Sequence, residues 1–376
     1  MYATKNRLNQ VLTAPAMLAV WGAAATALTA WRVQGYQLGF SVPVTAVAAM
    51  AAGVLAVLIV RRPLPGNRIR VLAYVCAIAA TQVDGVFNAV VAMTPGLPYV
   101  PRNLGVGALL GEVLGAAALS VWTFFLVRAW MIDQLPRRSD TRSRFHRVSV
   151  GCAAATAALL VLFASNIAYN TLVVAFGVPD VDYPMFARGA GQWLVLGLSL
   201  ALAGVAEEPV FVGVALLLWP RLAGRTAVAV WVLTSLARAG IHLYYTAGAG
   251  AATGAAVILV ILWCAAWSGF NLLLVYRTRR LWPVMLAHGL QNSIGFAAAL
   301  SISYVSFADQ LLLSGATGLI MGTVLFLVSG SVCFLVLGVR RIWFGRTHTD
   351  QLNGKNCPLI QTPQWPPEPQ SHHTIG

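Results

Sequence analysis

Ten apolar segments constrain the fold of this chain more than any other feature of its sequence. Each has about 20 residues or more, the length that a helix needs to cross a bilayer. Barrel strands that span a membrane are only about 10 residues long and alternate in polarity. The segments cover residues 12–31, 39–60, 71–94, 104–127, 148–176, 190–219, 226–247, 251–276, 281–305 and 311–339. They predict an all-α, polytopic bundle of about ten transmembrane helices.

The placement of the basic residues predicts the orientation of these helices. If the N-terminus is cytoplasmic, nearly all of the 25 Lys and Arg residues fall on the cytoplasmic side. The exceptions are Arg32, Arg102 and Arg188 outside, and Arg238 within a span. Positive charge favours the cytoplasmic side, so both termini are predicted to be cytoplasmic. The net charge of +14 is then a topology signal beside anionic lipid, with no nucleic-acid partner, in a multi-pass protein of the cell membrane.

The chain divides into three parts by the distribution of its polar residues. Residues 1–150 form a group of N-terminal transmembrane helices with few motifs. Residues 151–340 form a transmembrane core that holds most of the polar residues expected at membrane depth. Residues 341–376 are polar and proline-rich, which predicts a disordered cytoplasmic tail.

Two adjacent carboxylates, Glu207 and Glu208, lie inside the sixth apolar segment. A carboxylate at membrane depth costs about 2.5–3.5 kcal/mol even on the most lenient scale, so the pair requires a role. Successive side chains on a helix point about 100° apart, so only one of them can face a given site directly. Pro209 follows at once and should loosen the turn. The pair predicts a general base, with an ion pair between helices as the alternative.

The next apolar segment carries Arg238 and His242 four residues apart, on one face of a helix. A buried arginine needs a carboxylate partner. Besides the two glutamates, only Asp84 and Glu112 are candidates for that pairing.

His288 and Asn292 are also four residues apart and share a helical face. An imidazole and a carboxamide placed in this way can donate two hydrogen bonds to one oxygen, as an oxyanion hole requires. They are equally compatible with a metal site that includes a glutamate.

These motifs in this order resemble the CPBP intramembrane protease family, the CAAX-protease and bacteriocin-processing group also called the ABI family. The family pattern is Glu-Glu-x-x-x-Arg, then Phe-x-x-x-His, then His-x-x-x-Asn or Asp. Phe211 to Gly213 and the stretch from Leu274 to Asn292 resemble the flanking family sequence. The resemblance covers about residues 190–300.

The sequence departs from the family pattern at two positions. Val212 stands where the family has its arginine, and Arg238 stands where it has its phenylalanine. One cation is lost and one is gained at neighbouring motifs. This exchange predicts that Arg238 supplies the missing guanidinium from the facing helix.

The resemblance implies an intramembrane endopeptidase that acts on membrane-associated, CAAX-type substrates, either membrane proteins or lipidated peptides. It implies that Glu207 and His242 activate a water, that His288 and Asn292 hold the oxyanion, and that Glu208 supports the site. It leaves open a mechanism without cofactor and one with Zn²⁺ bound by Glu207, His242 and His288.

Two other functions compete with the protease. The departures at Val212 and Arg238 favour a catalytically degenerate protein with a scaffold or immunity role. A proton-coupled transporter would use the carboxylates as proton sites. The protease also faces a geometrical demand, because residue counts spread His288, Glu208 and His242 over roughly 13 Å of depth in straight helices. Tilted or broken helices would have to bring them together.

Overall fold

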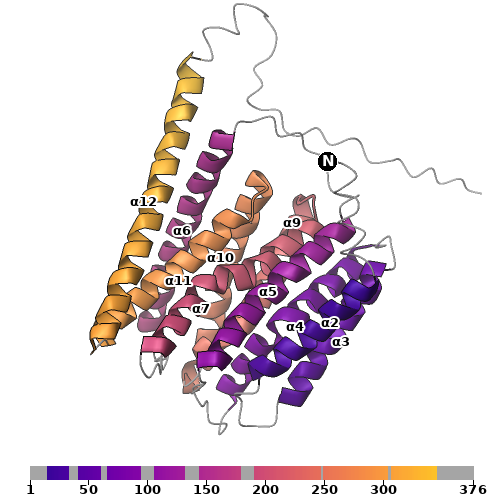
Figure 1. Cartoon of the computed structure of the whole chain (residues 1–376). Coiled ribbons are helices and arrows are strands. Elements are labelled where there is room, and N and C mark those ends of the chain that lie inside the picture. The colour runs from indigo at the N-terminus through magenta and orange to yellow at the C-terminus, as the bar shows by residue number, and fades with distance from the viewer. Residues whose placement is uncertain are drawn as a thin grey trace, which may run out of the picture. The chain divides into compact units, whose positions relative to one another are not determined.

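Helices account for nearly all of the chain that the structure, a computed structural model, describes (Figure 1). The described residues are 15–33, 41–60, 66–94, 106–131, 144–178, 190–246, 249–303 and 306–344. The predicted tail, 341–376, lies outside them beyond residue 344, as does the basic loop before α6 up to residue 143. Within the described residues the fold is all-α, which confirms the predicted fold class.

A helix lies at each of the ten predicted apolar segments, with ends that agree to within a few residues. The first five are α2 (Pro15–Val33), α3 (Ser41–Val60), α4 (Gly66–Met93), α5 (Val106–Met131) and α6 (Arg144–Ala175). The sixth is interrupted and consists of α7 (Ala190–Glu208), the π-helix η2 (Pro209–Val214) and α8 (Ala215–Leu218). The others are α9 (Gly224–His242) with the 3₁₀ turn η3 (Leu243–Thr246), then η4 (Gly250–Ala252) with α10 (Thr253–Thr278), α11 (Trp282–Ser303) and α12 (Phe307–Phe344).

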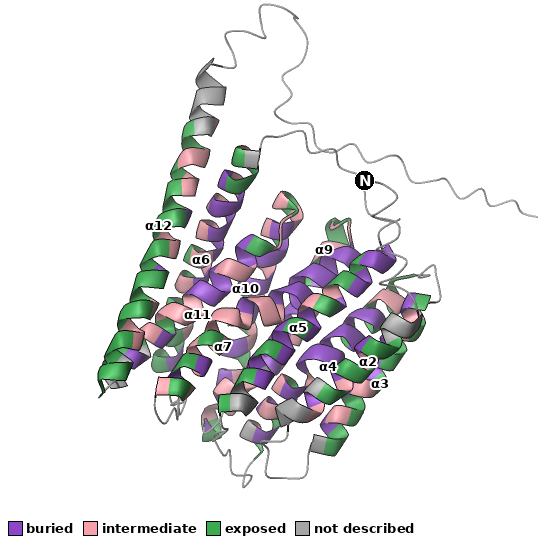
Figure 2. Ribbon diagram, viewed as in Figure 1, coloured by how far each residue is buried: buried purple, intermediate pink, exposed green. Residues whose placement is uncertain are grey.

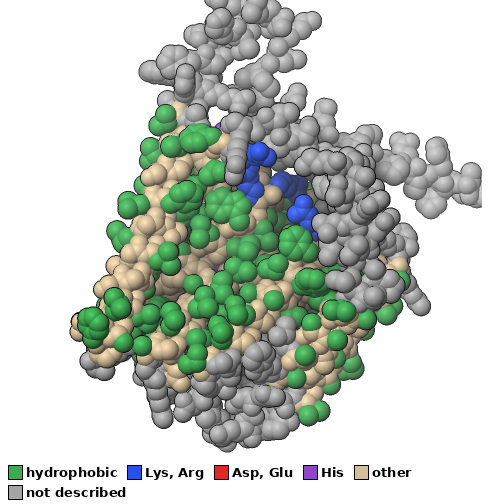
Figure 3. Space-filling view, viewed as in Figure 1, with side chains coloured by type: hydrophobic (Ala, Val, Ile, Leu, Met, Phe, Trp, Pro, Cys, Tyr) green, Lys and Arg blue, Asp and Glu red, His purple; other side chains and the backbone are tan. Residues whose placement is uncertain are grey.

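Eight of the described segments are long and apolar enough to cross a membrane. Helices α2 and α11 are not among these eight. Figure 3 shows hydrophobic side chains spread over the flank of the bundle and Lys and Arg side chains gathered at one end. A multi-pass membrane protein follows from this pattern, because lipid replaces water around its apolar flank.

The compact unit Met1–Ser331 contains the packed core, and Val332–Gly376 forms a second unit. Helix α7 packs on α5 and α11, while α9 packs on α4 and α10. The π-helix η2 lies among α4, α5, α9 and α10, and all six of its residues are buried. The centre of the bundle is therefore the interrupted segment that begins at the two glutamates.

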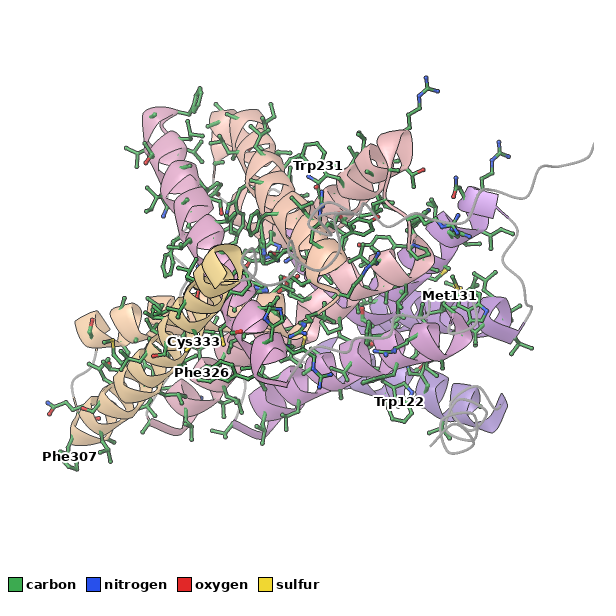
Figure 4. The ribbon with its side chains drawn as sticks, turned by 90° about the horizontal axis from the view of Figure 1, so that it is seen from above. Trp122, Met131, Trp231, Phe307, Phe326 and Cys333 are labelled. Carbon is green, nitrogen blue, oxygen red and sulfur yellow. The ribbon has the colours of Figure 1, made fainter. Side chains whose placement is uncertain are left out.

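Helix α12 differs from the others because most of it is exposed along its length (Figure 2). Only 11% of the 18-residue apolar stretch that qualifies it as a membrane span is buried, compared with 61% for the corresponding stretch of Ala190–Leu218. Phe307 is 79% exposed at its start, and Figure 4 shows this side chain and Trp122 of α5 on the outside of the bundle. These exposed apolar side chains are those expected to face lipid.

Candidate active site

Side chains from the N-terminal helices α4 and α5 bind the interrupted helix just before its break at Glu208. Pro209 has no backbone N–H to donate, and the chain continues as a π-helix, which often marks a functional position inside a helix. The backbone oxygen of Ala206 accepts hydrogen bonds from Gln82 Nε2 at 2.8 Å and from Ser120 Oγ. Carbonyls near the break are thereby satisfied, and the segment that carries the glutamates is fixed to α4 and α5.

Tyr74 on α4 provides a further support for the π-helix. Its hydroxyl donates to the backbone oxygen of Phe211 at 3.0 Å, and its side chain is fully buried. Tyr74, Gln82 and Ser120 are not among the predicted site residues. Their only sequence signal is that they are neutral polar groups in apolar helices.

Glu208 is the junction of four helices. Its carboxylate is completely buried and accepts two hydrogen bonds from Arg238 of α9, Nη1 to Oε1 at 2.8 Å and Nη2 to Oε2 at 3.0 Å. Asn271 of α10 donates from Nδ2 to Oε2 at 3.2 Å. The Nδ1 atom of His288, on α11, lies 3.0 Å from Oε1. A paired and hydrogen-bonded carboxylate of this kind is the form in which a buried charge is tolerated.

Arg238 is fully buried and sits between two aromatic rings. Its guanidinium carbon lies 3.9 Å from the centroid of Trp267 and 4.8 Å from that of Phe211. Its Nη1 also lies 3.7 Å from Glu207 Oε2, so one cation serves both glutamates. Val212 is buried and apolar, and the guanidinium that contacts the glutamates comes from α9. That it replaces the arginine of the family pattern stays a prediction.

Glu207 is the less constrained of the two carboxylates. Its side chain is 15% exposed, whereas that of Glu208 is fully buried. Its Oε2 atom is buried and accepts no hydrogen bond among the described residues. Glu207 is therefore held by the described side chains less tightly than Glu208.

His242 ends α9 and is almost fully buried. Its Nδ1 lies 2.9 Å from the backbone oxygen of Arg238, which can only accept, so Nδ1 carries the proton. This bond leaves Nε2 as a proton acceptor in the neutral ring. The imidazole is enclosed by Tyr245, stacked at 6.2 Å, and by Trp263 and Trp267, edge-on at 5.5 and 5.9 Å between centroids.

A close crossing of α7 and α11 positions His288. A Cβ added at Gly204 would overlap the backbone oxygen of Met285, and one added at Gly289 would overlap that of Ala201. Small residues let helix backbones approach in this way inside membranes. Gly289 follows His288 directly, so the crossing sets the distance between this imidazole and Glu208.

The predicted site residues are brought together unequally. Glu207, Glu208, Arg238 and His288 are joined by direct contacts, and the Trp267 ring contacts both His242 and His288. Residue counts place His288 and Glu208 at different depths in straight helices. In the structure the two side chains nevertheless meet, with Nδ1 of His288 3.0 Å from Oε1 of Glu208.

Asn292 lies one turn beyond His288 on α11 and is half-buried. The structure gives it no hydrogen bond to a described residue, and no contact that joins it to the glutamates. Asp84 is buried on α4, and the Glu112 side chain lies outside the described residues. Of the predicted carboxylates whose side chains are described, Glu207 and Glu208 form ion pairs with Arg238.

The predicted zinc ligands Glu207, His242 and His288 do not converge. The described residues contain no group of three His, Cys, Asp or Glu side chains that could hold a metal ion. The Arg238 guanidinium also lies beside Glu207, where a divalent cation would be repelled. The donor set therefore does not fit the metal.

Fold and site together define a helical membrane protein with a buried cluster of glutamate, arginine and histidine at its centre. Residues 189–294 match the model of a protein family described as type II CAAX prenyl endopeptidase Rce1-like. This match spans every predicted site residue from Glu207 to Asn292, and it confirms the resemblance to the CAAX-protease group. No curated protein and no solved structure matches the chain.

Proposed function

We propose that this protein is an intramembrane endopeptidase, in which glutamate and histidine activate a water to hydrolyse a peptide bond. One observation carries the proposal. Glu208 is bound by Arg238, Asn271 and His288, while its neighbour Glu207 keeps a buried carboxylate oxygen without a hydrogen bond. One carboxylate thus organises the site and the other is available for proton transfer.

In the proposed reaction Glu207 is the general base. It takes a proton from a water whose second hydrogen bond goes to Nε2 of His242, and the water oxygen attacks the carbonyl carbon. Glu207 then gives the proton to the leaving amine as the C–N bond breaks. Arg238 compensates the charge of both glutamates throughout, as their shared partner.

His288 and Asn292 are the proposed donors to the oxyanion. Nδ1 of His288 is directed at the Glu208 carboxylate, and only the imidazolium form of the ring has a second N–H, at Nε2, to donate to the substrate. The Asn292 amide is one helical turn away and has no partner among the described residues. Donors that are positioned before reaction stabilise the developing charge at little reorganisation cost.

The proposed substrates are membrane-associated polypeptides of the CAAX type, either membrane proteins or lipidated peptides, cleaved within the cell membrane. Support comes from the family match over residues 189–294 and from the position of the site inside apolar spans. The lipid bilayer is the medium in which substrate and enzyme meet.

The test is cleavage of a panel of prenylated and unmodified membrane peptides by the purified chain in proteoliposomes. We expect Glu207→Gln to lose about 10²–10⁴-fold in kcat, the usual contribution of a general base. Asp84→Asn is the matched control, since it removes another buried carboxylate on a different helix and should leave cleavage intact. Equal cleavage by wild type and Glu207→Gln refutes Glu207 as the general base. Cleavage by neither refutes the peptidase and favours the scaffold role, which the valine at position 212 suggests.

A further inference from the structure

Buried polar atoms without partners gather around the candidate site. Glu207 Oε2, Arg238 Nε, Trp267 Nε1, Ser268 Oγ and Asn271 Oδ1 have no hydrogen-bond partner among the described residues. Native proteins leave few such atoms, and each one calls for an explanation. They leave donors and acceptors at this site that a bound polar group can satisfy.

Most of these atoms have a local explanation. The Arg238 guanidinium is stacked between aromatic rings, so its Nε faces π-systems and not acceptors. Asn271 already uses its amide nitrogen on Glu208, and Glu207 Oε2 is the proposed base. Ser268 follows Trp267 in the helix and points about 100° away from it. The indole N–H of Trp267 remains, a donor with no role in the reaction described so far.

Trp267 is the side chain that joins the parts of the site. Its ring lies edge-on to His288 at 4.5 Å between centroids and to His242 at 5.9 Å, and its face receives the Arg238 guanidinium. Only 2% of the residue is exposed. The indole therefore contacts both imidazoles to which the proposed reaction assigns a role.

Neighbouring indoles show that an unbonded N–H is not the rule in this part of the bundle. Trp263, one turn earlier on α10, donates from Nε1 to Asn166 Oδ1 at 2.8 Å. Trp231 on α9 donates to the backbone oxygen of Ala265 at 2.8 Å. The N–H of Trp267 is thus distinguished from two others nearby by its lack of a protein acceptor.

We propose that the Trp267 N–H donates a hydrogen bond to the carbonyl oxygen of the scissile peptide bond. This inference rests on the proposed peptidase function. As the water oxygen bonds to the carbonyl carbon, the C=O electron pair moves onto this oxygen, and the N–H stabilises the resulting charge. The pair returns when the C–N bond breaks and the amine takes the proton from Glu207.

The first test replaces the N–H and keeps the ring. Trp267 is changed to 3-benzothienylalanine, in which sulfur takes the place of N–H, and separately to Phe. Both variants should lose about 10²–10³-fold in kcat, with KM within about threefold, as for removal of one oxyanion donor. Trp231→Phe is the matched control, since its N–H already donates to the backbone oxygen of Ala265, and it should lower Tm while keeping kcat within about threefold.

A second measurement does not depend on turnover. The indole ¹⁵N–H resonances of the full chain are followed while an N-octanoyl Leu-Leu-Leu aldehyde is added, and the Trp267 signal is assigned by its loss in the Phe variant. We expect a downfield shift for Trp267 and none for Trp231, whose N–H already donates to a backbone oxygen.

The outcomes separate the two proposals. A wild-type chain that cleaves, with a benzothienyl variant equally active, overturns the role of Trp267 and leaves the peptidase function standing. A wild-type chain that cleaves no peptide overturns the peptidase function. In that case an unchanged Trp267 resonance also overturns the inference, whereas a shift supports the N–H as a carbonyl donor in a binding site.

Discussion

Replacing Gly289 with alanine should detach His288 from Glu208. The added Cβ would overlap the backbone oxygen of Ala201, because α7 and α11 cross with their backbones in contact. An ordinary contact requires the two helices to separate locally by about 1 Å. The hydrogen bond between His288 Nδ1 and Glu208 Oε1, now 3.0 Å, would then exceed hydrogen-bonding range.

Two effects of this substitution can be given a magnitude. Overpacking at the crossing costs about 1–3 kcal/mol, and the better helix propensity of alanine returns at most about 1 kcal/mol. Activity should fall more than stability, because a displacement of about 1 Å at a catalytic group costs on the order of 10²-fold in rate.

The assay compares kcat and the unfolding free energy of Gly289→Ala with those of Gly295→Ala. Gly295 lies on the same helix, and a Cβ added there meets nothing within 4 Å. The control should keep wild-type kcat and gain up to about 1 kcal/mol of stability. If Gly289→Ala matches this control in both quantities, the close crossing does not position His288, and the reasoning is refuted.

Two further predictions concern the supports of the glutamates. Arg238→Phe should lower the unfolding free energy by about 3–5 kcal/mol, since it leaves Glu208 buried without its cation. Adding Val212→Arg to that variant should recover more than about 1 kcal/mol of unfolding free energy and part of the cleavage activity. A double-mutant cycle that shows no coupling between the two positions would refute the proposed exchange. Tyr74→Phe should cost about 1–3 kcal/mol by leaving the Phe211 carbonyl unsatisfied. Chemical denaturation of the detergent-solubilised protein measures this cost, and a change below about 0.5 kcal/mol would show that another donor serves the carbonyl.

The order of the motifs predicted which charged residues meet, because a charge inside a membrane has few partners to choose from. Arg238 needed a carboxylate, and the structure pairs it with Glu208. The neutral polar side chains that bind the interrupted helix could not be predicted in this way. Gln82, Ser120 and Asn271 bind the interrupted helix or its carboxylate, yet nothing in the sequence separates them from polar residues that satisfy their own backbone.

The sequence by itself determined the all-α membrane fold, since apolar segments of this length must bond their backbones internally. It also determined that two glutamates, an arginine and two histidines would be kept from lipid. Only the tertiary structure decided which side chains bind Glu208 and leave Glu207 Oε2 without a donor among the described residues. These contacts depend on how far the helix is rotated at Pro209 and on the depth at which α9, α10 and α11 cross it. The spacing of residues along one helix gives neither the rotation nor the depth.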